Sequence, residues 1–231
     1  MFAREGFSPR LADKDLVLTY DDGPGPNTIK IAEYLSARSI RATFFVVGKY
    51  VRERPDGVRK VAELGHVIGN HTDTHRSLPE LVSEPEALSK EVLECDREIQ
   101  RHLGVRPFLF RAPGLAWAPE IAELLNRNPE FEKYRGPFDR DICCADYDVG
   151  RPSPNHQPDG LPYTLQRAQA NYLQAIQGRG SGVVLLHDWA ANEGDEGEAL
   201  RRNNQTLRLT EWLIPQLEQY GFRFRTLDEV V

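Results

Sequence analysis

The chain has 231 residues, of which 40% are hydrophobic, and a formal net charge of -6. This length suits one large α/β domain, and we expect a single domain over residues 1–231. The acidic balance disfavours a nucleic-acid or anionic-membrane surface, which needs clustered Lys and Arg.

No segment approaches the ~18 apolar residues that a membrane-spanning helix needs, so we predict no membrane span. The first residues contain no apolar stretch typical of an export signal. A leader that had already been removed would leave the same sequence, so the compartment stays open. Nothing in the sequence predicts a protein partner.

The first predicted strand spans residues 16–20 and ends at two adjacent acids, Asp21 and Asp22. Gly23 and Pro24 follow and cannot continue a strand. A helix is expected next, capped at Asn27 or Thr28. Because ligand sites of α/β folds form at the carboxyl ends of parallel strands, the acid pair is a candidate for function rather than a simple turn.

The rest of the chain repeats the strand-helix alternation. Further strands are predicted at residues 42–48, 66–70, 108–110, 142–145, 182–186 and 222–224. Helices are predicted around residues 58–64, 83–103, 121–125, 165–176 and 207–220, the second of them with a capping box at its start. Residues 126–162 and 190–204 are expected to be mainly loops, and residues 227–231 a tail. This alternation predicts a parallel sheet that is closed or nearly closed.

His71 and His75 follow the third predicted strand and lie four residues apart. On one helical turn their rings would share a face and could bind one metal ion. From spacing alone, two solvated surface histidines are the commoner outcome. Asp22 adds a carboxylate at the same sheet edge, and two histidines with one carboxylate leave positions open for water and substrate.

Asp21 would then be placed to take a proton from water at the metal. His187, at another strand end, is a candidate acid, although a hydrogen-bonded core histidine is the alternative. Arg111 would hold Asp21 in its ionised form, and Asp146 would neutralise and orient Arg111. The alternative for Arg111 and Asp146 is an ordinary surface salt bridge.

Five segments of the chain resemble the ordered motifs of the NodB-type polysaccharide deacetylases, carbohydrate esterase family four. They are residues 19–24 (TYDDGP), 71–75 (HTDTH) and 111–114 (RAPG), the strand end at Asp146, and residues 184–188 (VLLHD). The resemblance implies a distorted (β/α) barrel with about seven parallel strands. It also implies removal of acetyl groups from N-acetylated, or sometimes O-acetylated, sugars with a divalent metal, commonly zinc, with cobalt, nickel or manganese as alternatives.

The resemblance also assigns roles by position. Asp21 becomes the base, His187 the acid, and Asp22, His71 and His75 the metal ligands. Arg111 would tune Asp21, and Asp146 would tether Arg111. Leu186 would line the pocket for the acetyl methyl group, and the backbone N–H of Gly114 would help to bind the oxyanion. Three aromatic residues complete the expected site: Tyr20, where the family usually has Phe, and Trp117 and Trp189, which are sugar-stacking platforms or core residues.

The expected function is therefore a metal-dependent hydrolase that deacetylates N-acetylglucosamine units of a glycan such as chitooligosaccharide or peptidoglycan. Three alternatives stay open: an O-acetyl esterase acting on acetylated xylan, a non-haem iron oxygenase, and a carbohydrate-binding protein without turnover. No organic cofactor is expected.

Overall fold

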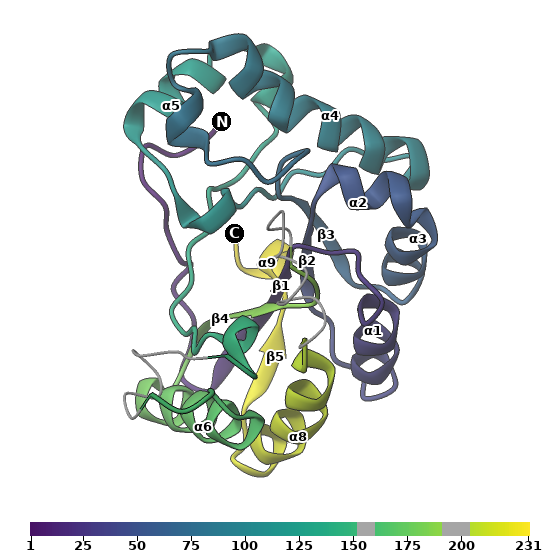
Figure 1. Cartoon of the computed structure of the whole chain (residues 1–231), viewed down its shortest axis with the longest axis vertical. Helices are drawn as coiled ribbons and strands as arrows, with labels where there is room; N and C mark the ends of the chain where they lie inside the picture. Colours follow the sequence, from purple (N-terminus) through teal and green to yellow (C-terminus); the bar gives the residue numbers. More distant parts are fainter. Residues whose placement is uncertain (152–159, 191–203) are drawn as a thin grey trace.

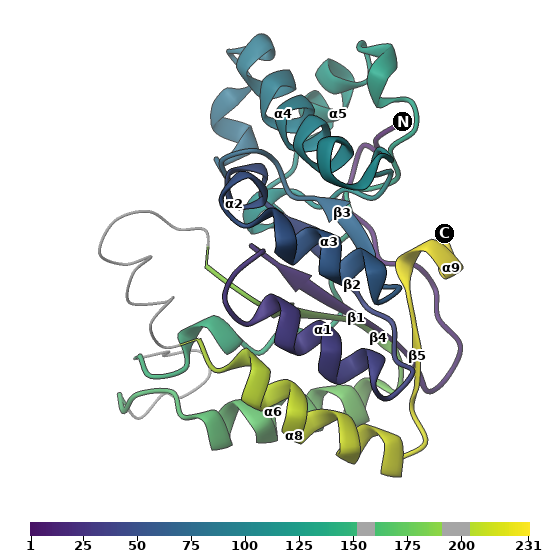
Figure 2. The ribbon, with the colours of Figure 1, turned by 90° about the vertical axis from the view of Figure 1, so that its right-hand side faces the viewer.

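The protein is described here by a computed structural model that covers residues 1–151, 160–190 and 204–231. Its centre is a parallel sheet wrapped by helices (Figures 1 and 2). The strands are β1 (Asp15–Asp21), β2 (Thr43–Val46), β3 (Val67–Asn70), β4 (Gly182–His187) and β5 (Arg223–Arg225). The predicted loop at residues 190–204 lies almost entirely outside the described residues.

Strand β1 occupies the middle of the sheet and is buried along its whole length. One edge pairs with β4 over six residues, which places Asp21 beside His187. The other edge pairs with β5 near the start of β1 and with β2 near its end. Because all pairings are parallel, the strand ends that carry the candidate site residues meet at one edge of the sheet.

Two of the seven predicted strands are reduced to isolated bridges. In the first, Phe110 bridges to Asn70 at the end of β3 and Leu109 bridges to Arg135; in the second, Ile142 bridges to Val184 of β4. Between them, residues 135–142 close the barrel irregularly, since the N–H of Phe110 donates to Arg135 O and that of Ile142 to Val183 O. Pro137 lacks the N–H that a ladder needs, which explains why this side forms no regular strand. The barrel is thus distorted, as expected, with five regular strands in the described part of the chain.

Helices cover the outside of the sheet (Figure 2). The α-helices are α1 (Thr28–Ser36), α2 (Gly48–Glu53), α3 (Pro55–Glu63), α4 (Pro85–Leu103), α5 (Pro119–Leu125), α6 (Leu165–Arg179), α8 (Thr206–Gln219) and α9 (Leu227–Val230). Short 3-10 turns are η1 (Leu78–Leu81), η2 (Pro113–Leu115), η3 (Pro129–Phe131) and η4 (Asp146–Asp148). None of these described helices is both long enough and apolar enough to cross a bilayer.

Helix ends differ in two places from the sequence prediction. The capping box expected at Ser83 does not form, because Glu84 occupies the N-cap of α4 and makes no side-chain cap bond. Gly104 does end α4, in the left-handed conformation that glycine adopts without strain. The predicted tail is instead the short helix α9, and Thr226 and Glu229 form a capping box at its start.

Alternation along the strands divides the core into two layers. Inside the barrel, Val17, Phe45 and Val183 pack on Leu109 and Phe138 from the irregular side. Outside it, the alternate residues of β1, β2 and β4 pack against the covering helices. A separate apolar cluster lies beneath α4 and α5. The odd-numbered residues of β1 therefore face the barrel interior, and Asp21 is the last of them.

Candidate active site

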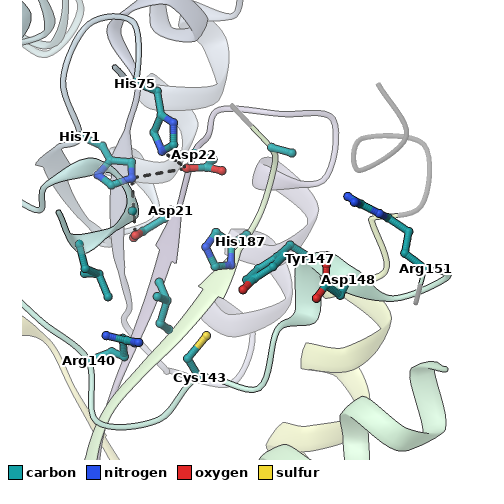
Figure 3. Close-up of a pocket in the computed structure, with 14 residues that line it drawn as sticks. Asp21, Asp22, His71, His75, Arg140, Cys143, Tyr147, Asp148, Arg151 and His187 are labelled. Atoms are coloured by element: carbon teal, nitrogen blue, oxygen red, sulfur yellow. Dashed lines mark ion pairs between the residues drawn. The ribbon is translucent and has the colours of Figure 1, made fainter. Parts of the chain in front are cut away.

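A pocket of about 300 Å³ opens at the carboxyl ends of β1 and β4 (Figure 3). Its lining includes five of the predicted site residues: Asp21, Asp22, His71, His75 and His187. The remaining lining residues are Gly114, Leu115, Arg140, Cys143, Tyr147, Asp148, Arg151, Leu185 and Ala190. Five segments of the chain, within residues 21–22, 71–75, 114–115, 140–151 and 185–190, therefore meet here.

Asp22, His71 and His75 converge on one point of this pocket (Figure 3). Asp22 Oδ1 lies 3.4 Å from His71 Nε2 and 3.1 Å from His75 Nε2. The other ring nitrogen of His71 donates to the carbonyl of Arg111 at 2.8 Å, which directs Nε2 toward the group. Three ligand atoms within 4.8 Å of one another, one of them on a ring with a fixed tautomer, fit a divalent metal.

The two histidines share a loop and not a helical turn, contrary to the sequence prediction. Residues 71–75 are irregular, and both Thr72 and His75 have positive φ, at 68° and 63°. The N–H of His75 donates to Thr72 Oγ1, and this hydrogen bond closes the loop. The rings are brought together by the tight turn, with centroids 5.0 Å apart, so the pairing was predicted for the wrong local structure.

The electrostatics of the group favour an ionised carboxylate. Burial opposes the charge of Asp22, but His75 and His71 outweigh burial and hold the pKa of this carboxyl well below its usual range. For His75, burial again opposes the charge, and the neighbouring Asp22 raises the pKa of the imidazole above its ordinary value. A site that holds a deprotonated carboxylate between two imidazoles is suited to a cation.

Asp21 is held by Arg111 inside the barrel. The guanidinium is fully buried, and its Nη1 donates to Asp21 Oδ1 at 2.8 Å and to Thr19 Oγ1 at 2.7 Å. The remaining guanidinium N–H groups donate to the carbonyls of Phe138 and Asp139. The irregular segment that closes the barrel thus supplies the acceptors that fix Arg111. The sequence prediction of an Arg111–Asp21 pair agrees with this geometry.

Asp146 does not tether Arg111, which corrects the prediction. Its Oδ1 accepts from Nδ1 of His187 at 3.0 Å, and its Oδ2 accepts from the backbone N–H of the same residue at 2.7 Å. Thr206 and Tyr172 donate to Asp146 from α8 and α6. Arg111 needs no carboxylate there, because backbone carbonyls already satisfy it. Two separate pairs therefore flank the metal group: Arg111 with Asp21, and Asp146 with His187.

His187 is set up to carry a proton. Burial opposes its charge, but the carboxylates of Asp146, Asp22 and Asp21 prevail and raise the pKa of the imidazole to about 10. Because Nδ1 bonds Asp146, Nε2 is the nitrogen left for the pocket. Tyr147 packs edge-on against the ring at 4.9 Å between centroids (Figure 3).

On β4, the leucine that lines the pocket is Leu185 and not Leu186; Leu115 also lines it. Leu186 faces outward into the helix-covered core, where Tyr20 also lies. Tyr20 stacks on Phe44, and its hydroxyl bonds Thr210, so it takes no part in the pocket. Strand alternation explains both corrections. Residues two apart share a face of the sheet, so Leu185 faces the pocket together with His187.

Gly114 lines the pocket as expected, with a φ of 58° and open space where a Cβ would stand. Neither predicted sugar platform does. Trp117 belongs to the cluster beneath α4 and α5, packing on Phe2 and Phe110. Trp189 packs on Tyr50 outside the lining of this pocket. The aromatic residue that does line it is Tyr147.

Sequence reasoning missed most of the lining supplied by residues 140–151. Arg140, Cys143, Asp148 and Arg151 come from a segment without periodic pattern, broken by prolines nearby. Of these residues, only Tyr147 could have been identified from the sequence, because it is an aromatic residue directly after Asp146.

Comparison with known proteins gives consistent results. A family model described as polysaccharide deacetylase matches residues 9–129. A chitooligosaccharide deacetylase of a Bradyrhizobium species is 28% identical over 233 residues, covering 98% of this chain and 95% of that protein. A peptidoglycan-N-acetylglucosamine deacetylase of Bacillus cereus is 26% identical, with 95% and 89% covered. The structure of the chitin deacetylase from Colletotrichum lindemuthianum superimposes with a TM-score of 0.75 at 25% identity, covering 96% and 89%.

Proposed function

The chain belongs to the polysaccharide deacetylase family, and from this premise we propose that it removes acetyl groups from N-acetylglucosamine units of a glycan. Chitooligosaccharide and peptidoglycan fragments are the proposed substrates, since relatives of nearly full length carry those names. Family membership favours a hydrolase over the oxygenase and the binding protein without turnover.

The arrangement of side chains in the pocket supports this proposal independently of family membership. The pocket contains a metal-binding group, Asp22 with His71 and His75, flanked by the two supported pairs Arg111–Asp21 and Asp146–His187. Hydrolysis of an amide needs a group that accepts a proton and another that donates one, on either side of the carbonyl. The two pairs supply these roles from β1 and β4.

A divalent metal held by Asp22, His71 and His75 would supply Lewis acidity, polarising the acetyl carbonyl and lowering the pKa of water. Asp21 is the proposed base. Its Oδ1 accepts from Arg111 Nη1, and its Oδ2 lies 3.7 Å from His71 Nε2 on the side of the metal group. A positioned base of this kind contributes typically about 10²- to 10⁴-fold in rate.

His187 is the proposed acid, protonating the departing amine from Nε2. Asp146 keeps the imidazole oriented and favours its protonated form. The backbone N–H of Gly114 would donate to the oxyanion, and Leu185 would form the wall against the acetyl methyl group. Tyr147 would support the sugar beside His187.

Zinc is the proposed metal. Two imidazoles and one carboxylate form a ligand set that zinc uses in open catalytic sites, and cobalt, nickel or manganese are accepted by similar donors.

The test is acetate release from a panel of N-acetylated chitooligosaccharides, peptidoglycan fragments and O-acetylated xylan. Chelator-stripped protein, with and without added zinc, is assayed side by side. We expect release from an N-acetylated substrate that disappears on stripping and returns with zinc.

Two results would contradict the proposal. Release from acetylated xylan alone would assign the O-acetyl esterase function instead. No release from any substrate by protein that holds one zinc per chain would favour a binding protein.

A further inference from the structure

The loop that carries His71 and His75 is held from three sides. The N–H of His71 donates to Val46 O on β2, and that of Thr72 to the side-chain oxygen of Asn70. On the α2 side, the N–H groups of Gly48 and Lys49 donate to the carbonyls of Thr72 and Asp73. The third contact comes from helix α4.

That third contact is a carboxyl clasp made by Glu91. One of its oxygens accepts from the Thr74 N–H at 2.9 Å, and the other accepts from the Thr74 hydroxyl at 2.6 Å. Glu91 is only 7% exposed, although it points from α4 toward a loop residue on the surface. A nearly buried carboxyl costs stability unless it is hydrogen-bonded, and here both oxygens are engaged by one residue.

Thr74 directly precedes His75, whose ring is less constrained than that of His71. His71 is 2% exposed in its side chain and has its Nδ1 bonded to the Arg111 carbonyl. His75 is 18% exposed, and within the described residues its Nδ1 has no hydrogen-bond partner. Apart from its contacts with Asp22 and the His71 ring, the direction of the His75 ring is set by its backbone, which has an unfavourable φ of 63°.

We propose that Glu91 is a positioning residue of the metal site, which fixes the Thr74–His75 peptide and so directs His75 Nε2 at the metal. The proposal rests on the metal-dependent function given above. Glu91 touches neither metal nor substrate, so its effect should be on metal affinity and on the geometry at the metal. Neighbours that orient metal ligands typically change affinity about 10- to 100-fold.

Four variants test the clasp. Glu91→Ala removes both bonds, and Thr74→Val removes only the hydroxyl bond. Thr74→Ser keeps the hydroxyl and serves as the conservative rescue. Glu94→Ala is the matched control, since Glu94 lies on the same helix and its identified partner is Arg97.

The measurements are the zinc dissociation constant, by competition with a chromogenic chelator, the visible spectrum of the cobalt form, and the melting temperature of the metal-free protein. We expect Glu91→Ala to weaken zinc binding by about 10- to 100-fold and to alter the cobalt spectrum. Thr74→Val should act in the same direction with a smaller effect. Thr74→Ser and Glu94→Ala should bind like the wild type.

Combining Glu91→Ala with Thr74→Val should add little to Glu91→Ala alone, because both act through one contact. A zinc affinity of Glu91→Ala and Thr74→Val equal to that of Glu94→Ala would overturn the proposal, even if their metal-free melting temperatures fell. If Glu91→Ala fails to fold, the zinc affinity of Thr74→Val compared with that of Thr74→Ser tests the proposal. Failure of the wild type to bind zinc would instead refute the proposed function itself.

Discussion

Arg111 connects the closure of the barrel to the chemistry of the pocket. Its charge is fully buried, yet each of its hydrogen bonds is made inside the barrel, to Asp21, Thr19 and two carbonyls of the irregular segment. Its guanidinium also lies 4.5 Å from the ring centroid of Phe45. Removing the charge of Asp21 would leave this cation without its carboxylate.

Asp21→Asn is expected to lower kcat by about 10²- to 10⁴-fold, because an amide cannot accept the proton that a carboxylate accepts. Zinc affinity should change little, since Asp21 is not among the three converging ligands. Acetate release and chelator competition check the two statements. Glu123→Gln, at an exposed carboxylate bonded to Arg4 and outside the pocket, is the control. Loss of zinc binding in Asp21→Asn would count against the assignment of Asp21 as base.

The pKa of His187 gives a pH prediction with a definite sign. Its value in the folded metal-free protein, about 10, lies above the ordinary 6.5, so bound protons stabilise the fold. This contribution is fully present below pH 6.5 and is lost as the pH rises through about 10. Asp146→Asn removes the carboxylate that raises it, so the pKa should fall toward 6.5.

Proton NMR titration of the His187 ring in metal-free wild type and Asp146→Asn measures this shift. Bound zinc should lower the pKa of the wild-type ring, because a second cation in the pocket repels the imidazolium. An unchanged pKa in Asp146→Asn would show that Asp146 is not the partner that matters.

For single residues, the sequence predicted which side chains belong to the site better than it predicted which way they face. Asp21, Asp22, His71, His75 and His187 all meet in the pocket. Leu186 and Asp146 were given wrong contacts, since the face of a strand and the partner of a carboxyl depend on register and on distant segments. Strand alternation, applied backward from His187, would have found Leu185.

Among the elements, α2 contacts the loop of residues 71–75 at Gly48, whose N–H donates to the Thr72 carbonyl. A Cβ at this position would meet the Asp73 carboxyl oxygen and would lie 2.9 Å from Cys95 Cα on α4. The Cys95 backbone can give way only if helix α4 moves, and Asp73 only if its side chain or the loop moves.

Gly48→Ala should therefore lower the free energy of unfolding by about 1–3 kcal/mol and weaken zinc binding. Gly178→Ala is the matched control, because a Cβ there meets nothing within 4 Å inside helix α6. That substitution should be neutral or stabilise by up to about 1 kcal/mol. Denaturant unfolding of both variants compares them, and equal stability would refute the steric argument.

Element types were predictable where periodicity was strong, as for β1, β4 and α4. Residues 108–110 and 142–145 resemble strands in composition, but they pair only through isolated bridges: Leu109 with Arg135, Phe110 with Asn70, and Ile142 with Val184. The loop of His71 and His75 was taken for helix because spacing alone cannot distinguish a helical turn from a tight loop.

For the whole molecule, metal binding should be linked to stability. The three ligands come from the end of β1 and from the loop after β3, so the complete site exists only in the folded chain. Zinc at 100 times its dissociation constant should add about 2.7 kcal/mol. For a chain of this length, this corresponds to a rise of roughly 5–11 °C in Tm.

Scanning calorimetry of chelator-stripped protein at increasing zinc concentrations measures this effect. A Tm independent of zinc would contradict a site assembled by folding. Magnesium at the same concentrations is the control, because it prefers oxygen ligands over imidazole.

The closure of the barrel could be predicted only in outline. Alternating strands and helices indicate a closed or nearly closed sheet, but the closing segment is irregular and its contacts are long-range.

The central place of β1 has a consequence for amide hydrogen exchange. Its N–H groups lie in a strand that pairs with three others, so they should exchange only through global unfolding, whereas the surface loop at Thr74 can open locally. Asp22, at the end of β1, would stay in place while His75 departs. Metal release would then begin on the histidine side, and its rate would follow local opening of that loop.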